Sequence, residues 1–348
     1  MKLYTEMDIN RVYIVMGLRC NFNCKYCYEK HMKYNDYEVS DKVINYLKRL
    51  VELKPFASKK PIHILFWGGE PLLYINVIKK FIDELQGLPF TYGTVSNGFL
   101  FTPEIVDYFN NHNIGVAISN DGVNTKLTRN IDILQIPQKV DIIKNINNLA
   151  IDSVISAYNY NYLQTIDYVY EKINREVPIA FEWLHCDKNT PKELYTIDYD
   201  KYELYLDDYF NRINQCVENN ITSQFVNDIF GEVSSLYHTS NVLEPRCGQM
   251  RNTLNLDLQG NIMACHPSTI LGRVDSEYSD MVEKYDKEIN QAFSFCDCGN
   301  CEYLMVCKAG CPLELPCDGK LAICKAKRIY FKKFFEYFDR YKVGDNFD

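Results

Sequence analysis

The sequence lacks an excess of positive charge and any long apolar run. Its 348 residues carry 46 acidic and 38 basic side chains, so the formal net charge is −8. This balance argues against general binding to nucleic acid or to an anionic membrane, because both need a basic surface. The first residues have no apolar core of a signal peptide, and no run approaches the length that spans a bilayer. We therefore expect a cytoplasmic protein without nucleic-acid or membrane partners.

Internal repeats and low-complexity linkers are also absent, whereas cysteine is abundant. The chain has 14 cysteines, which are too dilute for the disulfide framework of a small secreted protein. Thiols stay reduced in the cytoplasm, so we interpret these cysteines as metal ligands. With 47% hydrophobic residues, the chain can bury the core of one large or two ordinary domains.

One short loop holds three of the cysteines. Cys20, Cys24 and Cys27 follow the apolar run at 12–16. Three thiolates cannot close a tetrahedral site, and they suit a metal centre that keeps one position for a reactant. Their spacing also differs from the paired cysteines of common zinc sites. On this loop alone, a zinc knuckle or unrelated thiols are the alternative.

A Cys-x3-Cys-x2-Cys loop after a strand resembles the signature of the radical S-adenosylmethionine (SAM) superfamily. The resemblance implies that Cys20, Cys24 and Cys27 hold a [4Fe–4S] cluster whose fourth iron binds SAM. The aromatic Tyr26, directly before the third cysteine, also fits the family and is a candidate cofactor contact.

Strand-like and helix-like segments alternate over the first two-thirds of the chain. The expected strands are 12–16, 62–66, 91–95, 116–119, 153–158 and 179–184, and helices are expected after Ser40, at 75–85, after Thr102, at 137–149 and at 163–173. Six such units predict an α/β fold with right-handed crossovers. They match the partial (β/α)6 barrel of radical SAM enzymes, in which ligands bind at the C-terminal ends of the strands.

We divide the chain into three parts. Residues 8–190 are expected to form the radical SAM partial barrel, and 191–246 a helical bridge with two amphipathic helices. Residues 247–348 are expected to form a small cysteine-rich domain with a C-terminal helix at 325–341, whose aromatic side chains recur at helical spacing.

Gly68, Gly69, Glu70 and Pro71 follow the second expected strand. Two glycines allow the backbone to approach a ligand closely, and Glu70 can accept a hydrogen bond from a cationic amine. The four residues match the GGEP motif of the superfamily letter for letter. The resemblance implies that they bind the amino group of SAM, whereas alone they would form an ordinary turn.

Further residues resemble the family's SAM contacts. Asn97 lies in a Ser-Asn-Gly element after the third strand, similar to the family's TNG element. Ser119 and Arg129 match an S-x-D-G…R element after the fourth strand. A hydroxyl and a guanidinium suit the SAM carboxylate and ribose. The resemblance also suggests that Leu184 contacts adenine. A turn at Asn97 and a surface ion pair at Arg129 are the alternatives.

A second group of cysteines occupies the last third of the chain. Its members are Cys247, Cys265, Cys298, Cys301, Cys307, Cys311 and Cys324. Their spacing resembles that of the SPASM domain, which carries auxiliary [4Fe–4S] clusters. The resemblance assigns the distal cluster to Cys298, Cys301, Cys307 and Cys324. It assigns the proximal cluster to Cys247, Cys265 and Cys311.

The proximal cluster then lacks a fourth matched ligand. That position is open, reserved for substrate, or filled by one of the surplus cysteines Cys186, Cys216, Cys296 and Cys317. We favour the open site, because the seven-cysteine pattern is complete without them. A module with two zinc ions is the alternative for the whole segment.

The SPASM resemblance implies a peptide or protein substrate and a reductant such as flavodoxin or ferredoxin. Sulfatase-maturing members carry an acid directly after the second SPASM cysteine, where this chain has His266. We therefore expect a maturase that forms a thioether, carbon–carbon or related crosslink in a ribosomally made precursor peptide, ahead of a formylglycine maturase. His266 is a candidate catalytic base, because histidine titrates near neutrality; a packed or surface histidine is the alternative.

Two rival classes are a small-molecule radical SAM enzyme and a non-catalytic iron–sulfur electron-transfer protein. The complete GGEP motif and the open three-cysteine loop argue against the second. The first expected strand begins near residue 12, so we expect leader-peptide recognition to use the barrel rim, the bridge helices or another protein.

Overall fold

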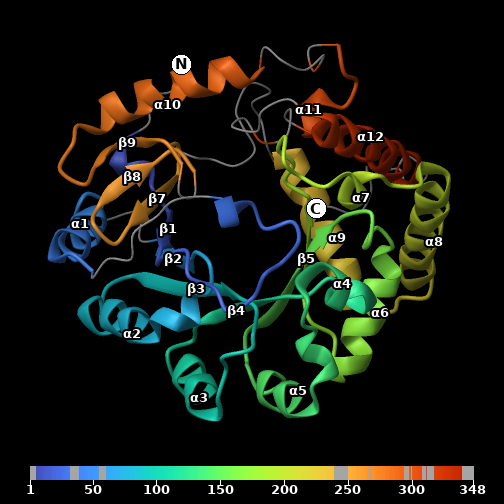
Figure 1. The fold of residues 1–348 in the computed structure, drawn as a ribbon, viewed down its shortest axis with the longest axis horizontal. Coiled ribbons are helices and arrows are strands. Elements are labelled where there is room, and N and C mark those ends of the chain that lie inside the picture. Colours follow the sequence, from blue (N-terminus) through green and yellow to red (C-terminus); the bar gives the residue numbers. More distant parts are fainter. Residues whose placement is uncertain are drawn as a thin grey trace.

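One curved sheet forms the centre of the molecule (Figure 1). The computed structural model describes residues 5–31, 39–54, 60–238, 250–265, 268–293, 298, 300–307, 311 and 317–338. The strand order is β6-β5-β4-β3-β2-β1-β7-β8-β9. The strands are β1 (Arg11–Val15), β2 (Ile62–Trp67), β3 (Phe90–Ser96), β4 (Gly115–Ser119), β5 (Leu149–Ile155), β6 (Ile179–Trp183), β7 (Thr253–Asp257), β8 (Asn261–Met263) and β9 (Ile270–Arg273).

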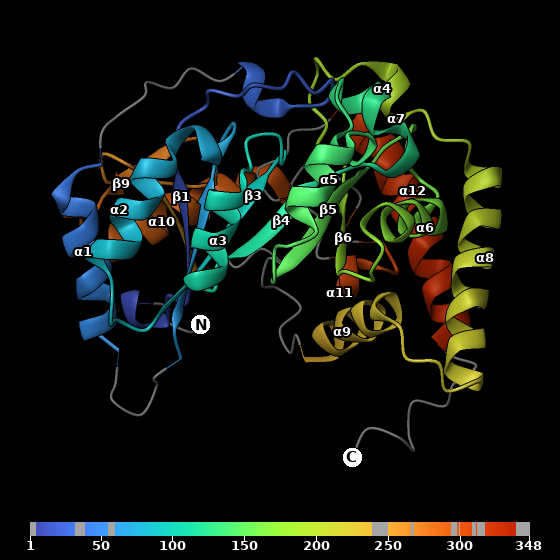
Figure 2. The ribbon, with the colours of Figure 1, turned by 90° about the horizontal axis from the view of Figure 1, so that it is seen from below.

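Strands β1 to β6 pair in parallel with their neighbours in sequence, as predicted. The helices that connect them lie on the outer face of the sheet (Figures 1 and 2). These are α1 (Asp41–Glu52), α2 (Ile75–Glu84), α3 (Pro103–Asn111), α4 (Thr125–Arg129), α5 (Pro137–Ile143) and α6 (Tyr162–Ile173).

Side chains alternate between the two faces of the sheet. In β2, Ile62, Ile64 and Phe66 are fully buried, and the residues between them are half-buried on the opposite face. Two of the predicted helix starts are capped as expected, since Ser40 accepts a hydrogen bond from the Lys42 N–H and Thr102 one from the Ile105 N–H.

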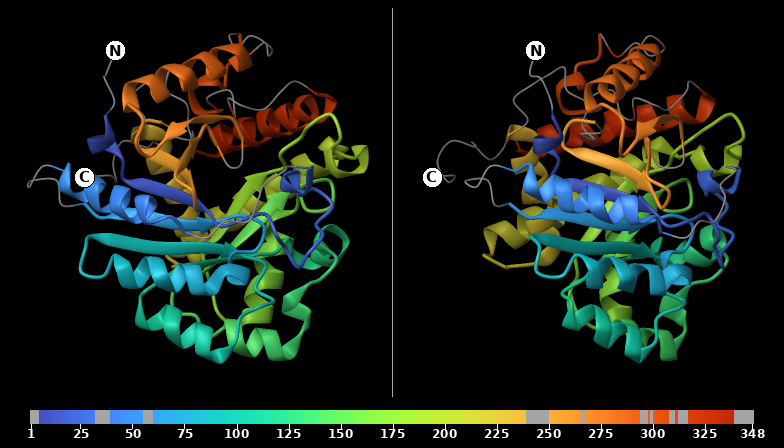
Figure 3. Two further views of the ribbon diagram at one scale, coloured as in Figure 1. Left: turned by 60° about the vertical axis from the view of Figure 1, so that its left-hand side comes forward. Right: turned by 90° about the vertical axis from the view of Figure 1, so that its left-hand side faces the viewer.

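The cysteine-rich segment extends this sheet. Strand β7 pairs in parallel with β1, with Tyr13 opposite Asn255, and β8 pairs antiparallel with β7. Strands β7 and β8 form a hairpin, and its position on the free edge of β1 was not predicted from the sequence. Figure 3 shows the orange hairpin beside the blue first strand. The segment that carries the second group of cysteines therefore joins the sheet next to β1, the strand that precedes Cys20, Cys24 and Cys27.

The largest difference from expectation lies between β4 and β5. The helix expected at 137–149 ends at Ile143, and β5 begins at Leu149, four residues earlier than predicted. The apolar residues Leu149 and Ile151 fit helical and strand spacing equally well in so short a run. Strand β9 and helix α10 (Tyr278–Phe293) were also not predicted.

The C-terminal helix packs on the bridge. Helix α12 (Asp318–Phe338) lies against α8 (Tyr199–Glu218), and Phe210 of α8 contacts the rings of Tyr330, Phe334 and Tyr337. This confirms the predicted aromatic face, although the helix begins seven residues earlier than predicted and residues 339–341 lie outside the described part of the chain. The remaining helices are α7 (Lys192–Tyr195), α9 (Gln224–His238) and α11 (Leu304–Cys307). None of the helices among the described residues is long and apolar enough to cross a membrane.

Candidate active site

The cysteine loop follows β1 and lies against the turn that follows β2. The Gly69 N–H donates to the Gly17 carbonyl at 2.9 Å, and the Glu70 N–H donates to the Arg19 carbonyl at 2.9 Å. A Cβ on Gly69 would lie 2.5 Å from the carbonyl oxygens of Leu18 and Arg19. A Cβ on Gly68, whose φ is +131°, would lie 2.2 Å from the Gly17 oxygen. These two glycines let the backbone of the cysteine loop pack closely against the turn after β2. From the sequence, we expected the close approach to be that of a ligand.

Glu70 is fully buried. Its Oε1 accepts hydrogen bonds from the Leu72 N–H at 3.0 Å and the Ser96 hydroxyl at 2.8 Å, and its Oε2 accepts from the Asn97 N–H at 2.9 Å. Burial raises the pKa of the Glu70 carboxyl, and these three hydrogen bonds oppose the shift. Two carboxylate oxygens offer about four acceptor positions. One position on Oε2 is therefore left for a cationic amine, which keeps the predicted SAM contact possible.

Asn97 connects the end of β3 with the cysteine loop. Its Nδ2 donates to Asn21 Oδ1 at 2.8 Å and lies 3.9 Å from the Cys20 sulfur. Its Oδ1 accepts from the Phe99 N–H at 3.0 Å. Asn97 thus forms the turn given as the alternative, and its side chain also lies beside Cys20, where a contact with SAM was predicted.

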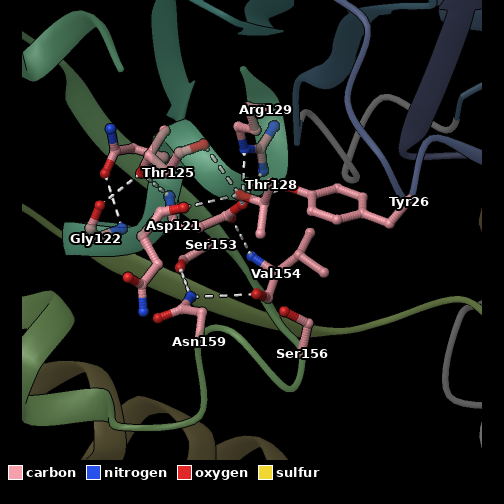
Figure 4. Close-up of polar contacts among 12 residues, drawn as sticks. Tyr26, Asp121, Gly122, Thr125, Thr128, Arg129, Ser153, Val154, Ser156 and Asn159 are labelled. Atoms are coloured by element: carbon pink, nitrogen blue, oxygen red, sulfur yellow. Dashed lines mark hydrogen bonds and ion pairs between the residues drawn. The ribbon is translucent and has the colours of Figure 1, made fainter. Parts of the chain in front are cut away.

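A carboxylate with five donors lies at the end of β4 (Figure 4). Asp121, 1% exposed, accepts from the hydroxyls of Tyr26 and Thr128 at 2.6 Å each, from the Val154 N–H at 3.0 Å, and from Nε and Nη2 of Arg129 at 3.1 Å each. These donors belong to the cysteine loop, α4 and β5. Asp121 therefore fixes the loop to the barrel wall, a role that the sequence analysis did not assign to it.

Arg129 is buried and uses two of its five N–H groups on Asp121. The alternative of a surface ion pair is therefore wrong, because the Arg129–Asp121 pair is buried. Its guanidinium carbon lies 5.2 Å from the Tyr26 ring centroid. Three N–H groups remain for an anionic ligand, so the predicted contact with the SAM carboxylate stays a prediction.

The remaining predicted SAM contacts lie on β4 and after β6. Ser119 ends β4 and is half-buried, in register with Asp152 of β5. Leu184 is 2% exposed, and its N–H donates to the Ile155 carbonyl at 3.1 Å. Its side chain lies in the hydrophobic core.

The three thiols of the loop influence one another. Burial raises the pKa of Cys24 to about 11; the Arg129 charge opposes this shift, while Cys27 and Cys20 add to it. Burial also raises the pKa of Cys20 and of Cys27. Among the described residues, no three Cys, His, Asp or Glu side chains converge as they do around a single metal ion. An all-thiol set in one loop suits an iron–sulfur cluster, whose cysteine ligands bind different irons.

Two carboxylates on adjacent strands occupy the same part of the barrel. Asp152 of β5 pairs with Ala180 of β6, and Glu182 lies two residues further along β6. Burial, and next the Glu182 charge, raise the pKa of the Asp152 carboxyl to about 7, while Arg129 opposes the shift. The Asp152 Oδ1 is buried without a hydrogen-bond partner in the described part of the chain. Neither carboxylate belonged to a sequence motif, so no local signal identified them.

Tyr28 directly follows Cys27, and Cys265 of the second cysteine group is close enough to influence its ionisation. Its ring packs on the His185 ring with centroids 5.6 Å apart. Burial raises the pKa of Tyr28 well above its usual value, and Glu29, Cys265 and Glu182 raise it further through their negative charge. Cys265, two residues after β8, is therefore near the end of the cysteine loop.

The second cysteine group is described only in part. Cys265, Cys298, Cys301, Cys307, Cys311 and Cys324 are half-buried, whereas Cys247, Cys296 and His266 lie outside the described residues. Of the surplus cysteines, Cys186 and Cys216 are buried in the core. The Cys317 sulfur accepts a hydrogen bond from the Lys320 N–H at 3.4 Å, at the start of α12.

Comparison with known proteins agrees with this site. Residues 14–173 match the family model of the radical SAM superfamily. The chain is 26% identical over 346 residues to the radical SAM cyclopropyl synthase TigE of Paramaledivibacter caminithermalis, over 89% of this chain and 69% of that protein.

Two solved structures have a similar fold. The first is native anSMEcpe with bound S-adenosylmethionine and the Cp18Cys peptide (TM-score 0.72, 18% identity, 95% of this chain and 96% of that chain). The second is Streptococcus suis SuiB bound to the precursor peptide SuiA (TM-score 0.58, 12% identity, 89% and 75%). These similarities confirm the predicted fold class.

The chain is a radical SAM enzyme. Residues 14–173, which contain the cysteine loop and the GGEP motif, form a radical SAM domain, and such a domain implies a [4Fe–4S] cluster and SAM as cofactors. Among its relatives, TigE is similar over most of its length.

Proposed function

We propose that this enzyme modifies a ribosomally made precursor peptide in the cytoplasm, forming a thioether, carbon–carbon or related crosslink. The observation that carries the proposal is the position of Tyr28, which lies near both Cys27 and Cys265. A substrate held there would face the SAM site on one side and the second cysteine group on the other.

Cluster and SAM, when bound, supply a 5′-deoxyadenosyl radical that abstracts a hydrogen atom. The chain's own residues hold and shield the site. Cys20, Cys24 and Cys27 would hold the cluster, and the free acceptor position of Glu70 would orient the amino group of SAM. Arg129, fixed by Asp121, would meet the SAM carboxylate with its remaining N–H groups.

The second cysteine group would hold two auxiliary clusters with the ligand sets given above. Replacing Cys324 by Ala should remove the distal cluster, leave SAM cleavage in place and lower product formation. Replacing Cys296 or Cys317 by Ala should leave the iron content unchanged if the proximal site is open. Loss of a whole cluster in either variant contradicts the open site. For Cys317, a loss of helicity without loss of iron would instead reflect its bond to the Lys320 N–H.

The substrate test is anaerobic co-production of the enzyme with a candidate precursor peptide encoded beside it, followed by mass spectrometry. A crosslinked peptide that has lost two hydrogen atoms supports the proposal. Formylglycine in a co-produced sulfatase peptide, without any crosslink, would replace it with the sulfatase-type alternative. Flavodoxin or ferredoxin is the proposed reductant. His266 is the proposed base, and His266→Gln should then lower product formation without lowering SAM cleavage.

A further inference from the structure

The cysteine loop and α4 form one surface at the C-terminal end of the strands. The Lys25 N–H donates to the Thr128 carbonyl at 2.7 Å, and the Asn130 side chain donates to a carbonyl of the loop at 2.7 Å. These bonds hold the two segments side by side. We call this surface, made of residues 19–30 and 122–130, the loop–α4 face.

The exposed charges on the loop–α4 face are all positive. Arg19, Lys25, Lys30 and Lys126 are exposed, whereas Glu29, the one acidic residue in these two ranges, is 8% exposed. No carboxylate among the described residues forms an ion pair with Lys25 or Lys126. A local positive face on a chain of net charge −8 favours an acidic partner at this place.

Two apolar side chains lie on the same face. Val123 is 40% exposed and Leu127 is 49% exposed, whereas Thr125 and Thr128 of the same segment are buried. An apolar centre with a charged rim is the usual composition of a protein–protein interface. A face with so few side chains suits a transient contact, and electron-transfer complexes are among the smallest interfaces.

The loop–α4 face also lies next to the thiols of the first cysteine group. Cys20 is exposed, and Cys24, directly before Lys25, is half-buried. A protein bound to this face would therefore come close to the loop that would hold the cluster. Because the rate of electron transfer falls steeply with distance, this is a suitable place for an electron donor.

We propose that the loop–α4 face is the docking site of an acidic electron-transfer protein of the flavodoxin type. The inference rests on the proposed function, which includes a reductant for the cluster. Acidic side chains of the partner would pair with Lys25 and Lys126, and the apolar edge of its flavin would pack on Val123 and Leu127. In each encounter the reduced flavin is oxidised by one electron and the cluster is reduced by one.

The test is isothermal calorimetry of the reconstituted enzyme with a bacterial flavodoxin in its oxidised form. The double variant Lys25→Glu, Lys126→Glu should bind flavodoxin about tenfold more weakly or worse at low ionic strength. Added salt should narrow the difference, because both lysines are exposed. Lys60→Glu is the matched control, since the exposed Lys60 precedes β2 and lies at the opposite end of the sheet. Equal binding by the double variant and the original enzyme, or an equal loss in Lys60→Glu, would overturn the proposal.

The apolar part of the face has its own variant. Leu127→Ser should weaken flavodoxin binding at low and at high ionic strength, because salt does not screen an apolar contact. Leu88→Ser is its control, since the exposed Leu88 precedes β3 and lies at the opposite end of the sheet. Binding of a ferredoxin without binding of flavodoxin would overturn the proposal, as would displacement of flavodoxin by the precursor peptide.

The choice of reductant separates this inference from the proposed function. With reduced flavodoxin, the double variant should need a higher flavodoxin concentration for half-maximal 5′-deoxyadenosine formation. With dithionite, a small reductant that needs no docking site, its rate should equal that of the original enzyme, which also shows that the variant is folded. If dithionite supports peptide modification and the flavodoxin titrations of the two proteins coincide, only the docking site is wrong. If dithionite yields no modified peptide, the proposed function is wrong, and calorimetry still decides whether flavodoxin binds at this face.

Discussion

The Tyr26 hydroxyl donates a 2.6 Å hydrogen bond to Asp121 Oδ2 across 95 positions of the chain. Tyr26 lies inside the cysteine loop, and Asp121 lies at the end of β4. The bond joins the ligand-bearing loop to the opposite part of the barrel. The position of the three thiols therefore depends on a single buried carboxylate as much as on β1.

Tyr26→Phe should destabilise the protein by about 1–3 kcal/mol, because the buried Asp121 carboxyl loses one of its five donors. It should also lower the iron content of the first cluster. Denaturant unfolding and iron analysis measure the two effects. Tyr108→Phe is the matched control, since the buried Tyr108 hydroxyl has no partner among the described residues. Equal stability losses in the two variants would show that the Tyr26–Asp121 bond has no special role.

Gly69→Ala should displace the cysteine loop, because the new Cβ would lie 2.5 Å from two backbone carbonyl oxygens. A stability loss of about 1–3 kcal/mol is expected, together with weaker SAM binding by isothermal calorimetry. Gly231→Ala in α9 is the control, because nothing lies within 4 Å of its Cβ position. That variant should gain about 0.5–1 kcal/mol from helix propensity. Unchanged SAM binding in Gly69→Ala argues against the proposed role of the turn.

Asp152 should make stability depend on pH. Its folded-state pKa of about 7 lies above the unfolded value of about 3.9. The folded state binds this proton more tightly, so the contribution of Asp152 to stability is fully present below about pH 4 and is lost as the pH rises to about 7. The charged groups around Asp152 are Glu182 on β6, Arg129 on α4 and Asp121 after β4.

Asp152→Asn removes the buried charge, so the advantage of this variant in free energy of unfolding over the original protein should grow by about 2.5 kcal/mol between pH 5 and pH 8. Glu182→Gln should reduce the same pH dependence, because Glu182 raises the pKa of Asp152. Chemical unfolding at several pH values measures both. A constant difference between Asp152→Asn and the original protein would show that Asp152 ionises normally.

Hydrophobic spacing and helix-capping residues in the sequence predicted the individual strands and helix starts. Strand β2 begins at its predicted residue, and Ser40 and Thr102 cap helices as expected. The motif around Asp121 was visible in the sequence, yet its five donors come from three segments that only the fold brings together. The pairing of β7 with β1 and the approach of Glu182 to Asp152 are likewise non-local. No periodicity in the sequence encodes such contacts.

5′-Deoxyadenosine formation by the reduced, reconstituted enzyme supplied with SAM is the most direct test of SAM cleavage at the cysteine loop. We predict that the original chain forms 5′-deoxyadenosine and that the triple variant Cys20→Ala, Cys24→Ala, Cys27→Ala forms none. The triple variant should also lose about four of about twelve irons, because the auxiliary ligands stay in place. Equal 5′-deoxyadenosine formation by both proteins, or none by the original chain, would contradict the assignment of SAM cleavage to this loop.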